Sequence, residues 1–307
     1  MLKIKLFIAF LVLYSFNVSI AQQDSSKSPD DWDWHWKWNE SNDWKDFKYW
    51  NIDFDNTHPA ISLQYGLSSV NRDDIHSKFL NPNLIELKLG YIKERDFGSS
   101  DYITDHRYKY IYLSNESNKL AGKEAAGSEI AADMWRFGFG RLHGYGYKIG
   151  ESSAIIPYYS YTLNWSNINF KYPENQSLIS NDDIEKLNLY DKSFRFGTSS
   201  EGGIRFKLIG NLILDAGYER SIVFQRHLFW KWAGSGLLEA AAQSLLDGFI
   251  NKIFKSSPAA GPVVNFLLKN ALAYGIYELR KDKMNWPFKS EAPITYDQFK
   301  FGVTFVF

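Results

Sequence analysis

The chain has 307 residues, of which 45% are hydrophobic and 17% aromatic, and its formal net charge is zero. Nucleic-acid binding requires a basic surface, so the charge balance gives no indication of such a partner. The absence of cysteine excludes disulfide bonds, a thiol nucleophile and thiolate metal ligands.

The first 21 residues have the features of a secretory signal peptide. Lys3 and Lys5 form a charged region, residues 6–18 an apolar core, and Ser19-Ile20-Ala21 a cleavage site with small residues at its ends. The apolar run is shorter than the roughly 20 residues that a membrane-spanning helix needs. We therefore expect an exported protein whose mature chain starts near Gln22.

Residues 22–58 form a polar segment that is rich in tryptophan. Trp32, Trp34, Trp36 and Trp38 alternate with polar residues, so an extended backbone would place four indole rings on one face. Tryptophan is favoured at membrane–water interfaces, where its ring is half apolar and its N–H stays hydrated. We interpret the segment as a periplasmic arm lying along the membrane surface. A plug in a barrel mouth, a small added sheet and a carbohydrate-stacking ladder are the alternatives.

From residue 60 onward, apolar and polar residues alternate in segments of about ten residues, which predicts β-strands with one apolar and one polar face. The third segment places Tyr108, Tyr110 and Tyr112 on its apolar face. The polar faces carry small and charged residues, which favours a barrel with a polar interior over a soluble sandwich. The eight predicted strands cover residues 60–68, 83–93, 108–115, 133–148, 154–165, 194–209, 211–224 and 296–307.

Residues 236–281 break the alternation and predict an α-helical hairpin before the last strand. Leu237 and Leu245 lie on the apolar face of the first helix, and Glu239 and Asp247 on its polar face. Ser256-Ser257-Pro258 ends this helix, and the second covers about residues 263–281. Polar residues argue against two membrane spans, namely Asp247, Asn251, Asn265, Lys269 and Asn270.

We expect the two helices to bury their apolar faces on each other and to cap the barrel mouth. Contact with the membrane surface, with a lipid or with a partner protein is the alternative, because interfacial helices have the same pattern. Residues 228–232, which include Trp230 and Trp232, suit a girdle at the outer membrane interface.

The chain ends on an aromatic residue, in phase with four apolar residues at a spacing of two: Phe299, Phe301, Val303, Phe305 and Phe307. This ending resembles the C-terminal signal strand of bacterial outer-membrane β-barrel proteins of the small eight-stranded class. The resemblance covers the signal peptide and residues 60–307. It implies an all-β fold, an eight-stranded antiparallel transmembrane β-barrel in the outer membrane of a Gram-negative cell. It also implies that the barrel-assembly machinery recognises the last strand.

In that family both ends of the barrel sequence lie in the periplasm, with short turns there and long loops outside. The connections after the first, third, fifth and seventh strands are long here and would face outward. The turn over residues 94–107 departs from the family pattern because it should lie in the periplasm and is nevertheless long.

The polar faces would fill the narrow interior of such a barrel. Their charges have both signs, so we expect ion pairs that close the lumen, with an ion path as the lesser alternative. The residues expected to point inward include Glu86, Lys88, Lys109, Arg136, Arg195, Glu201, Arg205, Lys207, Asp215, Glu219 and Lys300.

Fold alone does not give a function. We expect a structural or binding role, with the outer loops and the hairpin as the interaction surface and with membrane lipid as a partner. A narrow channel and a lipid-modifying enzyme, acting on lipid A or phospholipid, are the alternatives. No histidine pair has metal-ligand spacing and no phosphate-binding loop is present, so neither metal nor cofactor is expected.

The enzyme alternative has four candidate residues. Asp73 and His76 follow the first strand, whereas Ser221 and His227 lie at the end of the seventh. Barrel closure could bring these regions together, and a histidine oriented by a carboxylate can activate a serine. His143 lies where the alternation of its strand drifts, and we expect a bulge or a strand end there.

Overall fold

The computed structural model describes residues 57–98, 100–122, 129–150, 152–173, 179–191, 193–208 and 211–307. The expected signal peptide and nearly all of the tryptophan-rich arm, including Trp32, Trp34, Trp36 and Trp38, lie outside the described residues.

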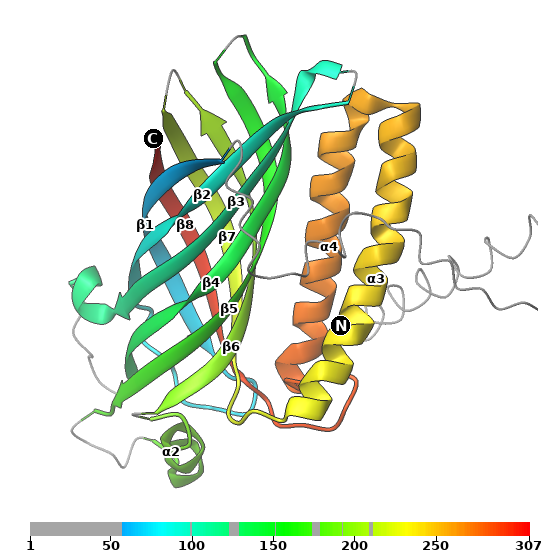
Figure 1. Cartoon of the computed structure of the whole chain (residues 1–307). Coiled ribbons are helices and arrows are strands. Elements are labelled where there is room, and N and C mark those ends of the chain that lie inside the picture. Colours follow the sequence, from blue (N-terminus) through cyan, green and yellow to red (C-terminus); the bar gives the residue numbers. More distant parts are fainter. Residues whose placement is uncertain are drawn as a thin grey trace, which may run out of the picture. The chain divides into compact units, whose positions relative to one another are not determined.

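Eight antiparallel strands form a closed barrel, as predicted (Figure 1). Each strand pairs with its neighbours in chain order, and β1 pairs with β8 from Ala60↔Val306 to Asn71↔Thr295. The strands are β1 (Thr57–Asn71), β2 (Asn83–Phe97), β3 (Ser100–Ser117), β4 (Ala131–Lys148), β5 (Ala154–Lys171), β6 (Phe194–Lys207), β7 (Leu212–Val223) and β8 (Ile294–Val306).

Short and long connections separate to opposite ends of the barrel. The three short turns lie at the end where β1 begins and β8 ends, and the long connections lie at the other end. The expected long turn over residues 94–107 is wrong, because β2 and β3 continue to Phe97 and Ser100. The added pairs include Glu94↔His106, where the carboxylate lies 2.9 Å from the imidazole Nδ1. The predicted bulge at His143 is also wrong, since β4 keeps one register with β3 through this region.

The polarity of the barrel is reversed relative to a soluble protein. Polar and charged side chains are buried in the interior, whereas large apolar side chains on the outer face are exposed. Period-2 alternation produces this arrangement because successive strand residues point to opposite faces. Exposed apolar side chains on the outer wall include Ile61, Leu63, Leu67, Leu87, Leu89, Ile111, Leu113, Phe137, Phe206, Leu214, Phe299, Phe301 and Phe305.

In β3 the predicted phase is wrong. Tyr108, Tyr110 and Tyr112 are buried in the interior, whereas Ile111 and Leu113 face outward. Lys109, expected inside, is exposed on the outer face as well. Tyrosine has an aromatic ring and a polar hydroxyl, so it can serve either face, and here the rings lie beneath interior cations.

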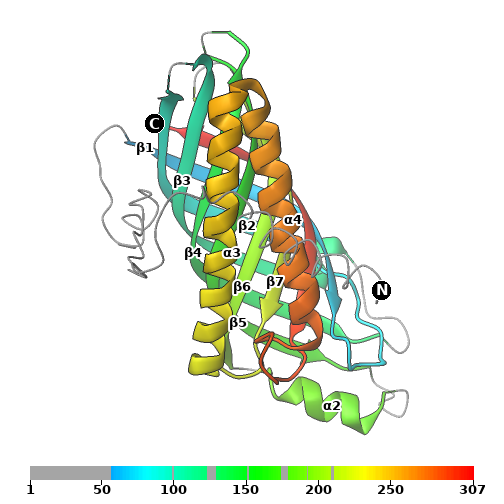
Figure 2. The ribbon, with the colours of Figure 1, turned by 90° about the vertical axis from the view of Figure 1, so that its right-hand side faces the viewer.

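The helical hairpin is present between β7 and β8, as predicted. It consists of α3 (Phe229–Ser256), the 3-10 turn η4 (Pro258–Ala260) and α4 (Gly261–Asp282). However, α4 packs along β4, β5, β6 and β7, so the hairpin lies against the outer wall of the barrel (Figures 1 and 2). The expectation that it caps the barrel mouth is therefore wrong.

Two shorter helices lie in the long connections, η2 (Asn118–Ala121) and α2 (Asn181–Asn188). The sequence pattern did not predict either. Within the described ranges, none of the helices combines the length and the apolar composition of a membrane-crossing helix.

Interior packing gives a first prediction at Gly140. A Cβ there would meet the Tyr110 ring at 2.7 Å and the Thr162 methyl group at 2.7 Å. Gly140→Val should therefore lower the free energy of unfolding by about 1–3 kcal/mol, the usual cost of overpacking. The midpoint of thermal unfolding, followed by circular dichroism, measures the effect.

Gly248→Ala is the matched control, because a Cβ at Gly248 in α3 meets nothing within 4 Å. This variant should be as stable as the parent or slightly more stable, since alanine favours helix. Equal melting of both variants would contradict the packing of Tyr110 against Gly140.

Candidate functional site

The centre of the lumen holds a buried network of ion pairs. Lys300 Nζ lies 2.9 Å from Glu86 and 2.7 Å from Glu201, and it also contacts Glu219. Arg136 lies 2.8 Å from Glu219 and 3.7 Å from Glu86. Each cation is thus shared among several carboxylates, as buried charges require. The sequence prediction of paired interior charges is confirmed at these positions.

Three tyrosines of β3 extend this network. The Lys88 Nζ lies 4.8 Å from the centre of the Tyr110 ring, and the Arg205 guanidinium lies 5.0 Å from that of Tyr108. Arg136 covers the Tyr112 ring in the same way, at 5.6 Å. These contacts place an aromatic face beside each of these three buried cations.

Both ends of the lumen are filled with side chains. At the long-connection end, a buried apolar cluster joins strand residues to the loops and α2, and includes Met134, Phe170, Leu187, Tyr190 and Tyr296. At the short-turn end, Tyr108 and Tyr158 pack with Ile92, Leu142 and Ile213. Side chains therefore fill the lumen at its charged centre and in these two clusters.

Asp183 of α2 holds the β1–β2 connection in place through hydrogen bonds at the long-connection end of the barrel. Its carboxylate accepts hydrogen bonds from the Ser77 hydroxyl at 2.7 Å, the Ser77 N–H at 3.0 Å and the His76 N–H at 3.2 Å. Burial acts to raise the pKa of Asp183, but these hydrogen bonds outweigh it and hold the pKa below its usual range.

The four candidate catalytic residues have separate surroundings. Ser221 is buried in the lumen, where its hydroxyl lies 3.0 Å from Arg136 and 3.0 Å from Ser199. His76 interacts with Asp183 through its backbone, and Asp73 accepts a hydrogen bond from Asn71. The contacts of these residues connect none of the four to another.

His227, the fourth candidate, belongs to an aromatic cavity at the start of α3. Its ring lies 5.0 Å from that of Phe196 and 5.6 Å from that of Trp232. Trp230, the second tryptophan expected at the membrane interface, is 83% exposed. The cavity has a volume of about 530 Å³ and is lined by Leu163, Trp165, Phe194, Arg195, Phe196, Phe224, Arg226, His227 and Trp232.

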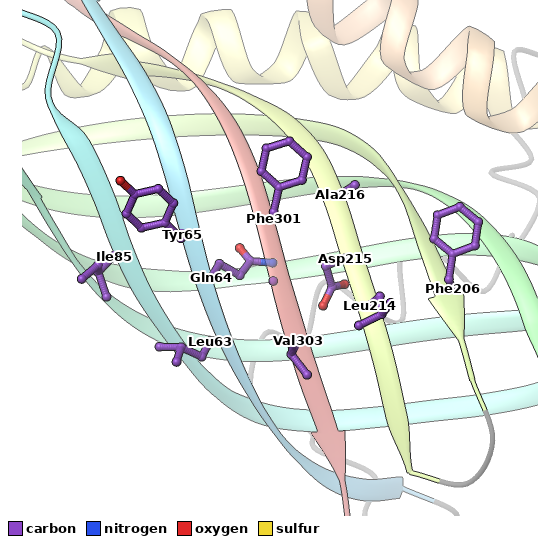
Figure 3. Close-up of a pocket in the computed structure, with 11 residues that line it drawn as sticks. Leu63, Gln64, Tyr65, Ile85, Phe206, Leu214, Asp215, Ala216, Phe301 and Val303 are labelled. Atoms are coloured by element: carbon purple, nitrogen blue, oxygen red, sulfur yellow. The ribbon is translucent and has the colours of Figure 1, made fainter. Parts of the chain in front are cut away.

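A second depression, of about 670 Å³, lies on the outer wall around β8 (Figure 3). The apolar side chains of Leu63, Phe206, Phe301 and Val303 surround it. Its lining also includes Asp215. The carboxylate of Asp215 points into the lumen, where it forms an ion pair of 2.6 Å with Arg205. The depression thus belongs to the apolar exterior and presents no free catalytic group.

Polar contacts attach the hairpin to the outer wall of the barrel. Lys269 of α4 is buried, pairs with Asp247 of α3 and donates to the Gln243 side chain at 2.9 Å. Gln243 in turn donates to the hydroxyl of Tyr161 on β5. The Lys269 ammonium also lies 5.5 Å from the ring centre of Tyr159.

The base of the hairpin is attached in a similar way. Tyr277 donates a hydrogen bond of 2.8 Å to Asp297 on β8, and the Arg220 guanidinium lies between the rings of Tyr218 and Tyr274, 4.7 Å from each. These interactions place the polar face of the hairpin against the barrel, although sequence analysis had expected the apolar faces to be buried.

No protein-family model and no curated protein matches the chain. Similar solved structures include Ail, the attachment invasion locus protein of Yersinia pestis, at 10% identity and a TM-score of 0.33, covering 82% of this chain and 99% of Ail. Neisserial surface protein A has 9% identity and a TM-score of 0.37, with coverage of 81% and 97%. The outer membrane protein OprG from Pseudomonas aeruginosa has 9% identity and a TM-score of 0.28, with coverage of 82% and 96%. These scores are too low to carry an argument, so barrel closure rests on the strand pairing itself.

From the ion pairs of the lumen we expect that replacing Arg136 strongly destabilises the protein. Glu116 lies 3.5 Å from Arg136, and this is the ion pair that compensates its buried carboxylate. Arg136→Met should lower the free energy of unfolding by about 3–5 kcal/mol, because it leaves Glu116 buried without a cation. Denaturant unfolding of the purified protein measures the change.

The double variant Arg136→Met/Glu116→Gln should recover part of the loss, since it removes the uncompensated charge. Lys109→Met is the control, because Lys109 is exposed outside the barrel. If Lys109→Met lowered the free energy of unfolding as much as Arg136→Met, this result would contradict a specific role for the lumen network.

The anchoring of the β1–β2 connection by Asp183 should depend on pH. A carboxyl with a lowered folded-state pKa contributes stability above its unfolded pKa, near 4, and loses that contribution as the pH falls through the folded value. Asp183→Asn should therefore increase amide hydrogen exchange in residues 74–80 at neutral pH. The difference from the parent should shrink as the pH falls below about 4 and disappear once the pH is below the lowered folded-state pKa of Asp183.

Asp182→Asn is the control for this experiment. Asp182 is exposed and pairs with Lys186 four residues later, at 2.7 Å. Its replacement should leave exchange in residues 74–80 unchanged. Exchange that rises equally in both variants would show that Asp183 has no special role in holding this connection.

Proposed function

We propose that this chain is an outer-membrane β-barrel protein of a Gram-negative cell with a structural or binding role, whose interaction surface consists of the outer loops and the hairpin. The observation that carries the proposal is the reversed polarity of a closed barrel. Leu63, Ile111 and Phe299 are 59%, 60% and 56% exposed, whereas Arg136 and Arg205 are completely buried. Water disfavours such an exterior, and the hydrocarbon core of a membrane favours it.

Closure of the sheet supports the same proposal. A membrane core offers no water to unpaired backbone groups, so a sheet can span it only as a closed barrel. The pairing of β1 with β8 meets this condition. The proposed assembly signal is consistent with the structure, because the apolar side chains of the C-terminal strand point outward where another protein could contact them: Phe299, Phe301, Val303, Phe305 and Phe307.

A binding or structural role is favoured over the two alternatives. The buried ion pairs and the two apolar clusters in the lumen argue against a narrow channel. The lipid-modifying enzyme is disfavoured because Ser221, its candidate nucleophile, lies inside the lumen. There its hydroxyl forms hydrogen bonds with Arg136 and Ser199. The surfaces that remain for interactions are the long connections at one end and the exposed face of the hairpin.

The natural absence of cysteine makes the orientation directly testable. Lys78 lies in the exposed β1–β2 connection, and Ser152 lies in the exposed β4–β5 turn at the opposite end. A membrane-impermeant maleimide should label Lys78→Cys in intact cells. It should label Ser152→Cys only after the outer membrane has been permeabilised.

Fractionation and bilayer recording complete this test. The protein should be recovered in the outer-membrane fraction, and its migration on a gel should depend on heating, as expected of a stable barrel. Purified protein should give no conductance in planar bilayers. Recovery of the folded chain as a soluble periplasmic protein would overturn the proposal, and a steady ionic current would restore the channel.

A further inference from the structure

We infer that the α3–α4 hairpin is itself embedded in the membrane, where it crosses the hydrocarbon core twice beside the barrel and binds lipid acyl chains through its exposed face. The inference rests on the proposed function, since it requires a membrane-spanning barrel. It specifies the partner of the hairpin as a lipid surface.

The first observation is the distribution of charge around the two helices. Glu239, Asp247 and Lys269 are the charged residues within residues 237–250 and 263–275, and each is at least partly buried. Every exposed residue in these two stretches is uncharged. These residues are Leu237, Leu238, Ala241, Ser244, Leu245, Gly248, Phe249, Val263, Leu267, Ala271 and Tyr274.

The inward-facing charged groups have partners within the protein. Lys269 pairs with Asp247, and Arg280 lies 3.0 Å from Glu239 and 2.9 Å from the Ser235 hydroxyl. Neither α3 nor α4 has the overall apolar composition of a helix that crosses a membrane alone. A helix packed against a protein wall, however, needs apolar residues only on the face that meets lipid. The polar residues that seemed to exclude a membrane location therefore face the barrel or the other helix, with Asn251 near the tip as an exception.

The second observation is the length of the uncharged face. On α3 it is bounded by Lys231 near the base and Lys252 near the tip. At 1.5 Å per residue these positions are about 32 Å apart along the helix. The hydrocarbon core of a typical bilayer is about 30 Å thick. The exposed face is therefore long enough to cross the core, with a charged residue at each end.

The third observation is the position of the hairpin tip. The Tyr147 hydroxyl donates a hydrogen bond to the carbonyl of Ala259, and the Phe254 ring lies 4.6 Å from Tyr145 and 4.5 Å from Phe97. Phe97 and Tyr147 lie at the short-turn ends of β2 and β4. The hairpin thus extends from the long-connection end of the barrel to the short-turn end (Figure 1).

The fourth observation is the barrel wall under the hairpin, which is unsuited to lipid. It carries Arg220 and Asp297, both of which contact α4. At Gly202 on β6 a Cβ would lie 2.2 Å from the Asn270 side chain, so glycine allows α4 to approach closely. This sector of the wall fits a helix, whereas the exposed face of the hairpin continues the apolar exterior of the barrel.

Single cysteines at Leu245, Leu267 and Ser257 test the inference. In intact and in permeabilised cells, Leu245→Cys and Leu267→Cys should resist an impermeant maleimide and react only after denaturation. Ser257→Cys, at the exposed tip, should react only after permeabilisation. Reaction of Leu245→Cys and Ser257→Cys in intact cells would show that the hairpin lies on the outer surface and would overturn the inference.

Two further measurements separate lipid from other causes of protection. Bimane attached at Leu245→Cys or Leu267→Cys, in protein reconstituted into phosphatidylethanolamine–phosphatidylglycerol vesicles, should be quenched several-fold more by brominated phospholipid than bimane at Lys78→Cys. Protection in cells combined with maleimide labelling in these vesicles would identify a protein partner and contradict lipid binding. Lys78→Cys and Ser152→Cys report the barrel orientation separately, so failure of the barrel proposal is distinguishable from failure of the hairpin inference.

Discussion

The pairing of β1 with β8 is the contact on which the rest of the structure depends, because it converts a sheet with two edges into a closed wall. Closure divides the strand side chains between a narrow interior and an exterior. Charged groups in the interior must then compensate one another, and Lys300 and Arg136 each contact several carboxylates. The exterior becomes apolar for the same geometric reason, since it consists of the alternate residues of the same strands.

The strands could be predicted because alternation follows directly from strand geometry, and most expected interior charges lie inside. The phase of β3 could not be predicted, because tyrosine suits both faces of a strand. The surrounding cations determine that its tyrosines face the interior. The extension of β2 and β3 beyond residue 93 was also missed. Its pairs, such as Glu94 with His106, are polar and resemble a loop in composition.

In the hairpin, the packing of the folded chain determines which face of each helix is buried. Its amphipathic pattern predicted two helices correctly and gave α3 the correct end at Ser256. Amphipathicity identifies two faces but does not say which face meets the solvent. Only the partners of Lys269 and Asp247 in the folded chain show that the polar face points inward. In the same way, no motif distinguishes Asp183, whose role depends on two backbone N–H groups that the fold brings to it.

The basic hairpin tip has a consequence for how such a chain could insert. Lys252 and Lys255 are exposed beside the short-turn end. In the proposed orientation this end faces the periplasm, the compartment from which an exported chain reaches the outer membrane. The two ammonium groups could then remain on the side of entry, so that insertion of the hairpin would avoid the cost of moving them through hydrocarbon.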